Sequence, residues 1–164
     1  MRTLSILASI TIIFLVMFIP VGQAETPFEI TGCKTGPAIM LSSSQELIIF
    51  SVELKGVIMS NHENKVFDNF ATHFVGVAQA MAGKINALGY SKLIDPDGDF
   101  IFVESAQVGP IGGELTWKFL EGTGKWKGIT GGGKSRIITK GKVIVEGTYR
   151  DCHRAIGTFE LPKK

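Results

Sequence analysis

The chain has 164 residues, with 17 lysines and arginines against 15 aspartates and glutamates, which gives a net charge of +2. A chain of this length buries a substantial core as a single domain. No basic block exists beyond the terminal Lys163-Lys164. The chain therefore lacks the electrostatic footprint of nucleic-acid binding, and we expect no nucleic-acid partner.

The first 24 residues are typical of a secretory signal peptide. Arg2 is the only charge before Glu25, Leu4–Ile19 is largely apolar, and Pro20–Ala24 ends on small residues that a signal peptidase reads. The alternative is an uncleaved membrane anchor, because the uncharged stretch is nearly long enough to span a bilayer. We expect a signal peptide over residues 1–24, a single domain over residues 25–164, and a secreted or periplasmic location.

The rest of the chain is a series of short alternating apolar and polar runs separated by turn residues, as in antiparallel β structure. The Ala-rich stretch Gln79–Asn86 is left open between a helical turn and a wide loop. No long amphipathic helical period is present, and abundant glycine favours a closed barrel over a sandwich. The predicted strands are Phe28–Cys33, Leu47–Met59, Val66–Ala78, Leu88–Ile94, Phe100–Ser105, Glu114–Glu121, Lys125–Thr130, Ser135–Thr139, Lys142–Cys152 and Ala155–Leu161.

The segment Asp95–Asp99 reads Asp-Pro-Asp-Gly-Asp and predicts a tight turn between two strands of a hairpin. Asp95, Asp97 and Asp99 also begin like a calcium loop. Such a loop needs glycine at the sixth position and glutamate at the twelfth, whereas here the glycine is fourth and the twelfth residue is Ala106. The turn is favoured, and weak calcium binding stays open.

Gly128–Ser135 matches the phosphate-loop pattern G-x-x-x-x-G-K-[ST]. That pattern binds phosphate only where a strand enters the loop and a helix leaves it. The residues that follow, Arg136–Tyr149, are β-branched and interrupted by glycine, which favours a strand. We therefore interpret the segment as a Gly-rich turn of a β protein and expect no ATP binding.

Two cysteines, Cys33 and Cys152, lie near the two ends of the predicted domain. A barrel places its first and last strands side by side, so a disulfide is reasonable in an oxidising compartment. Closing so long a loop would contribute about 4–5 kcal/mol in the chain-entropy model. Two separate buried thiols are the alternative.

The candidate site residues are few. His62, His73 and His153 have no zinc spacing, no metal or cofactor is expected, and no catalytic residue is assigned. His73 shares a strand face with Val75 and Val77, where a lone histidine is either a core residue or a functional one. Aromatic side chains either line a cavity or fill a small barrel. The ligand-binding candidates are His73, Glu104, Phe102, Trp117 and Tyr149.

Two segments carry a family resemblance. Gly89–Phe102, with its DPDGD turn, and Gly113–Gly131, which ends GTGKWKGITG, resemble secreted bacterial members of the allene oxide cyclase-like barrel group. The second segment is also similar to the Gly-x-Gly-Lys-aromatic-x-Gly segment of plant dirigent proteins. The similarity runs from Glu53 to Phe159. It implies a single antiparallel closed barrel of about eight strands with an apolar cavity, often in a homo-oligomer. No active-site motif of either group matches, so no catalytic role is transferred.

These observations lead to three functional hypotheses. The leading one is a secreted or periplasmic barrel that binds a small, mainly apolar molecule in its lumen, with one or two polar groups that orient it. The second is an isomerase or cyclase that uses the same cavity, which requires a lumenal polar group with a perturbed pKa. The third is a structural or interaction barrel without a pocket.

Overall fold

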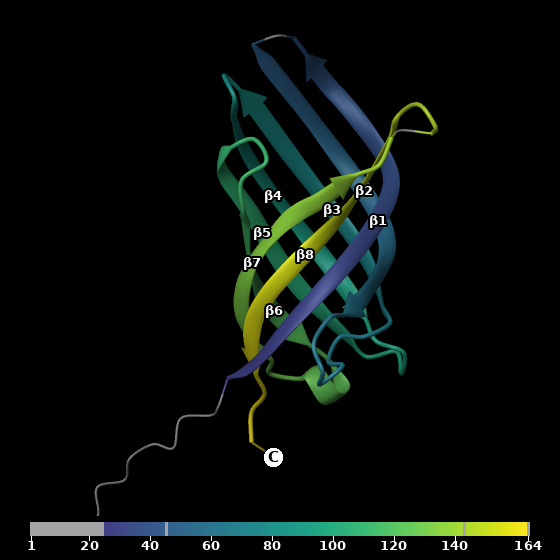
Figure 1. Ribbon diagram of the computed structural model, residues 1–164, viewed down its shortest axis with the longest axis vertical. Coiled ribbons are helices and arrows are strands. Elements are labelled where there is room, and N and C mark those ends of the chain that lie inside the picture. Colours follow the sequence, from purple (N-terminus) through teal and green to yellow (C-terminus); the bar gives the residue numbers. More distant parts are fainter. Residues whose placement is uncertain (1–24, 45, 143, 164) are drawn as a thin grey trace, which may run out of the picture.

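The structure is a computed structural model that describes residues 25–44, 46–142 and 144–163. The predicted signal peptide, residues 1–24, lies outside the described residues. The described chain forms eight strands and one short 3-10 helix (Figure 1). They are β1 (Thr26–Ser43), β2 (Leu47–Ser60), β3 (Phe70–Met81), β4 (Lys84–Ile94), β5 (Phe100–Pro110), β6 (Leu115–Gly122), η1 (Gly124–Trp126), β7 (Thr130–Lys140) and β8 (Thr148–Glu160).

The strands form a closed barrel in sequence order, and every neighbouring pair is antiparallel. β8 pairs with β1 over residues 26–37 and 148–159, which completes the circle. This architecture confirms the all-β class and the eight-stranded closed barrel. Because side chains alternate along each strand, every second residue enters the lumen. On β2 these are Phe50, Val52 and Leu54, as the alternating pattern of Leu47–Met59 predicts.

A disulfide lies on the seam where the barrel closes. Cys33 of β1 and Cys152 of β8 are direct register partners, with their Cα atoms 4.0 Å apart, and their sulfur atoms are bonded. The neighbouring residues Lys34 and Asp151 line the lumen, so the two cysteines point to the outer side of the wall. The covalent bond therefore joins the first and last strands.

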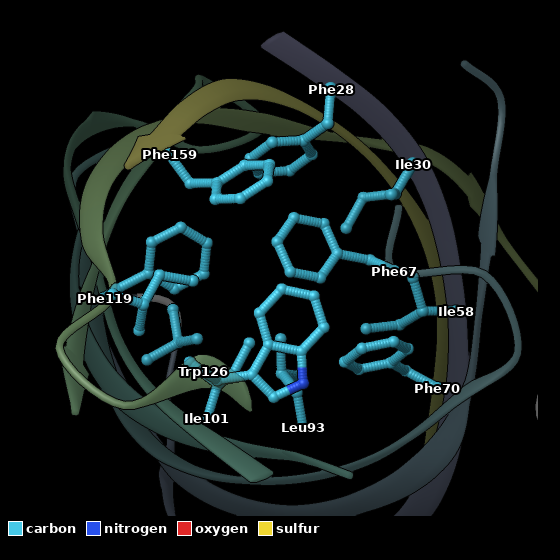
Figure 2. Close-up of a cluster of buried hydrophobic side chains, with 12 residues drawn as sticks. Phe28, Ile30, Ile58, Phe67, Phe70, Leu93, Ile101, Phe119, Trp126 and Phe159 are labelled. Carbon is cyan, nitrogen blue, oxygen red and sulfur yellow. The ribbon is translucent and has the colours of Figure 1, made fainter. Parts of the chain in front are cut away.

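One end of the barrel is closed by a cluster of buried apolar side chains, which we call the plug. Phe67, from the β2–β3 connection, stacks on Trp126 of η1 with ring centroids 5.2 Å apart. Figure 2 shows these two rings pointing inward, within a ring of side chains from the strands. The plug consists of Phe28, Ile30, Ile58, Phe67, Phe70, Leu93, Ile101, Val103, Phe119, Trp126, Ile129 and Phe159.

The prediction of a strand over Lys125–Thr130 is wrong. Gly124 has φ of +50°, and the chain turns there into η1 and a following turn. This path carries the Trp126 ring into the plug, where its indole Nε1 donates to Asp95 Oδ2 at 2.8 Å. Burial of a large aromatic ring thus outweighs the local β pattern.

Several other strand boundaries differ from prediction. β1 continues to Ser43 rather than ending at Cys33, and β7 begins at Thr130 rather than Ser135. β3 begins at Phe70 rather than Val66, because Lys65, Phe67 and Asn69 have positive φ and form turns that bury Phe67. β8 begins at Thr148 rather than Lys142, directly after Gly147 at φ of +74°, and continues through the predicted break before Ala155. The undecided stretch 79–86 completes β3 and begins β4 around a tight turn at Ala82–Gly83.

Candidate functional site

The barrel encloses a cavity of about 210 Å³ above the plug. Its wall is built from all eight strands and is mainly apolar. Plug residues such as Phe28 and Phe119 form its floor. At the opposite end, none of the described residues of the four strand connections lines the cavity. The plug therefore closes one end of the cavity, and the described residues of these connections do not cover the other end.

Two aromatic rings lie flat against the wall because glycine leaves room for them. Phe74 covers Gly76, where an added Cβ would lie 2.6 Å from the ring. Trp117 covers Gly157 in the same way, again at 2.6 Å. Distances this short exclude any side chain at either glycine without displacement of the ring. These glycines thus preserve open volume in the lumen beside flat aromatic surfaces.

A polar cluster interrupts the apolar wall at the seam between β1 and β8. Tyr149, Asp151 and His153 alternate along β8, so all three enter the lumen, and Lys34 is the register partner of Asp151 on β1. His153 Nε2 lies 2.8 Å from Asp151 Oδ1, a close contact that is an ion pair when the imidazole is protonated. Lys34 Nζ lies 4.1 Å from the centroid of the Phe74 ring, within cation–π range.

Burial perturbs the ionisation of this cluster. It lowers the pKa of the Lys34 ammonium, and the charge of Asp151 only partly opposes that shift. Burial alone would raise the pKa of Asp151. The contact and charge of His153, with Lys34 and Tyr149, outweigh burial and hold the pKa of Asp151 below its usual range. Burial and the Asp151 charge raise the pKa of Tyr149, which keeps its hydroxyl protonated.

Trp117 carries an unused donor beside the cavity. Its indole Nε1 is buried and has no hydrogen-bond acceptor among the described residues. The Trp117 side chain also lines the cavity. Because leaving a buried donor unsatisfied costs free energy, a ligand whose binding turned the Trp117 ring so that this nitrogen faced it could accept the hydrogen bond and be stabilised.

The structure brings together two of the five candidates from the sequence. Trp117 and Tyr149 both line the lumen. His73, Phe102 and Glu104 do not, because strand alternation places them on the outer face. His73 contacts Glu53 at 2.9 Å, Glu104 pairs with Lys118 at 2.8 Å, and Phe102 is 37% exposed. Their outward orientation corrects the expectation that they contribute to a lumenal site.

The sequence-based set missed Lys34, Asp151 and His153. The signal was present on β8, because Tyr149, Asp151 and His153 occur at every second position and must share a face. Lys34 carried no such signal, since only the β1–β8 register places it opposite Asp151.

The acidic turn before β5 braces the plug. Asp95 Oδ1 accepts the backbone amides of Asp97 and Asp99, at 2.8 and 3.0 Å. Its Oδ2 accepts a hydrogen bond from Trp126 Nε1 and forms an ion pair with Lys125 Nζ at 2.9 Å. The carboxylate oxygens are thus occupied by protein donors. Within the described ranges, no three His, Cys, Asp or Glu side chains are arranged to hold a metal ion.

The Gly128–Ser135 segment runs from the turn after η1 into β7. A strand thus follows the loop, and the helix N-terminus that a phosphate loop uses is missing from this segment. Lys134 Nζ is 3.1 Å from Glu114 on the barrel surface.

Over the part of the chain that the structure describes, no helix has the length and apolar character needed to cross a bilayer. No protein-family model and no curated protein matches the sequence. Among solved structures, the chain is similar to the pterocarpan synthase dirigent protein GePTS1. The identity is 7%, the match covers 85% of this chain and 93% of that one, and the TM-score is 0.51. The protein therefore has a dirigent-like β-barrel fold.

Proposed function

We propose that this barrel binds a small, mainly apolar organic molecule in its lumen. The observation that carries the proposal is the cavity of about 210 Å³, which the plug closes at one end and whose apolar wall is interrupted by one polar cluster. Small-molecule sites generally combine these two features, since apolar walls supply affinity and a few polar groups fix orientation. Burial of apolar ligand surface contributes about 25 cal/mol per Å².

The cavity volume limits the size of the ligand. An apolar cavity of about 150 Å³ holds benzene. The lumen here is somewhat larger, which suits a single ring with a short substituent or a chain of comparable volume. The flat rings of Phe74 and Trp117 favour an aromatic or otherwise planar body.

The polar cluster would orient that molecule. Lys34 and the Tyr149 hydroxyl are hydrogen-bond donors that line the cavity, and Trp117 Nε1 is a donor without an acceptor. An oxygen-bearing group on the ligand would therefore face the β1–β8 seam, with its apolar body against the opposite wall.

Native mass spectrometry of protein purified from its own host tests the proposal. A bound molecule small enough for the cavity, released on unfolding, is the expected result. Protein that carries no such molecule, and that also takes up none of toluene, phenol and 3-phenylpropanol, would contradict the proposal.

An isomerase or cyclase is the second candidate, and it agrees with the resemblance to the allene oxide cyclase-like group. The observation that favours it is the Lys34–Asp151 pair in the lumen, because burial lowers the pKa of the Lys34 ammonium toward the range in which a group exchanges protons readily. If the bound compound is converted when it is returned to fresh protein, Asp151→Asn should lose conversion and retain binding. If the unaltered protein converts nothing, lumenal binding is the only function of the two that stands.

We also propose that the protein works outside the cytoplasm, since a disulfide on the barrel seam forms and persists in oxidising compartments. Mass spectrometry of the extracellular or periplasmic fraction, with the N-terminal residue identified, tests this location.

We further propose that the protein forms a homo-oligomer. Four side chains on the outer face of β3 and β4 are 43–50% exposed: Val75, Val77, Leu88 and Tyr90. Light scattering on the purified protein gives the oligomeric state directly.

A further inference from the structure

The end of the barrel opposite the plug carries exposed aliphatic side chains. The β1–β2, β3–β4, β5–β6 and β7–β8 connections meet there (Figure 1). Nine large apolar side chains in or beside these connections are between 47% and 81% exposed. We call this set the apolar rim: Ile39, Met40, Leu41, Met81, Val108, Ile111, Ile138, Ile144 and Val145.

The plug end is different. Its connections, residues 61–69, 95–99 and 123–129, are all described and contribute no exposed large apolar side chain. Their large apolar residues Phe67, Trp126 and Ile129 are turned into the plug instead. Strand ends beside the plug carry exposed apolar side chains too, such as Met59 at 47% and Leu120 at 46%, but those of the rim are more numerous and more exposed.

The rim surrounds the uncovered end of the lumen. Its most exposed members come from three separate parts of the chain: Leu41 at 70% near the end of β1, Val108 at 81% near the end of β5, and Ile144 at 80% in the β7–β8 connection. Apolar exposure that converges from separate parts of the chain is the mark of an interaction surface, because a folded monomer gains nothing from it. Since the rim members lie around an opening, a broad apolar surface would contact all of them at once, whereas a single inserted segment would not.

Charge distinguishes the same two ends. We count charges in the four rim-end connections together with the three strand residues on either side of each. Among the described residues of this set, Lys84, Lys140, Lys142 and Arg150 stand against Glu46, Glu114 and Glu146, an excess of one basic residue. One of those acids, Glu114, is already paired with Lys134. Counted in the same way, the three connections at the plug end have the opposite balance, with Lys65, Lys92, Lys125 and Lys127 against Glu63, Asp68, Asp95, Asp97, Asp99 and Glu121.

We propose that the apolar rim docks on the surface of a lipid bilayer that carries anionic headgroups, with the lumen opening toward the lipid. Aliphatic side chains enter the interfacial region while nearby lysine and arginine side chains contact headgroup phosphates, as for other interfacial proteins. The acidic plug end orients away from the same surface. This goes beyond lumenal binding, since it names a partner, and it gives an apolar ligand a route into the lumen without passage through water.

The test is sedimentation with vesicles of equal parts phosphatidylglycerol and phosphatidylcholine, compared with vesicles of phosphatidylcholine alone. Protein comprising residues 25–164 should bind the anionic vesicles more strongly than the phosphatidylcholine vesicles, and added salt should weaken that binding. A rim variant, Leu41→Ser with Val108→Ser and Ile144→Ser, should bind roughly tenfold more weakly or worse. A wall variant, Met59→Ser with Val75→Ser and Ile156→Ser, removes exposed aliphatic side chains away from the rim and should bind like the unaltered protein.

Three results would overturn the proposal: no binding of the unaltered protein to anionic vesicles, equal binding of the rim variant, or a rim-dependent dimer that ignores vesicles. Circular dichroism confirms that each variant is folded. Uptake of toluene, measured without vesicles, reports on lumenal binding separately. The rim variant should retain that uptake, so failure of one proposal does not resemble failure of the other.

Discussion

Lys34 on β1 and Asp151 on β8 are direct register partners whose side chains both line the lumen, one position away from the disulfide that joins Cys33 to Cys152. The seam that closes the barrel is thus also the place where its apolar lumen becomes polar. Covalent closure on the outer side of the wall holds the two strands that position the polar cluster on the inner side.

The first prediction concerns that disulfide. Replacement of both cysteines, Cys33→Ser with Cys152→Ser, should lower the free energy of unfolding by about 2–5 kcal/mol, because the unfolded chain regains the entropy that the bond removes. Urea unfolding measures the change. Treatment of the unaltered protein with a thiol reductant should give the same loss. Equal stability of oxidised and reduced protein would show that the bond contributes nothing to the fold.

The second prediction compares the two tryptophans. Trp126→Phe removes the donor to buried Asp95, so it should cost about 1–3 kcal/mol beyond the lost packing. Trp117→Phe is the matched control, because Trp117 Nε1 has no acceptor among the described residues and its loss leaves no new unsatisfied group. Thermal and urea unfolding of both variants measure the difference. A cost for Trp117→Phe as large as that for Trp126→Phe would contradict the assignment of Asp95 as a brace of the plug.

The third prediction concerns pH. The pKa of Asp151 is lowered in the folded protein, so its ionised form stabilises the fold at pH values above the unfolded pKa of about 3.9. That contribution should disappear as the pH falls below about 4 and passes through the folded pKa. The unaltered protein should therefore lose more stability than Asp151→Asn between pH 6 and the acid limit. Parallel stability curves for the two proteins would indicate that Asp151 is not stabilised by its neighbours.

The alternating pattern predicted much of the barrel, because solvent on one side and lumen on the other impose a period of two. It placed Phe50, Val52 and Leu54 on one face of β2. It also placed His73, Val75 and Val77 together on one face of β3. Alternation does not state which face is the lumen, however. His73 lies outside because the lumenal positions of β3 are those of Thr72 and Phe74.

The rest required tertiary contacts that no local pattern carries. Trp126 enters a 3-10 helix rather than a strand because its ring completes the plug beside Phe67, from a connection far earlier in the chain. Likewise, Lys34 belongs to the polar cluster only because barrel closure sets the register of β1 against β8. Closure of the barrel could be predicted from the sequence, since two cysteines near the ends of the domain suggested that the first and last strands are neighbours.

The most direct test of lumenal binding is to fill the cavity from one wall position and measure the uptake of toluene. Ala87 lines the cavity, whereas Ala71, on the adjacent strand, is exposed on the outer surface, so Ala87→Phe and Ala71→Phe form a matched pair. Toluene should raise the unfolding temperature of the unaltered protein and of Ala71→Phe, and should leave Ala87→Phe unchanged. An equal rise in all three proteins, or a rise in none, would contradict a ligand site in the lumen.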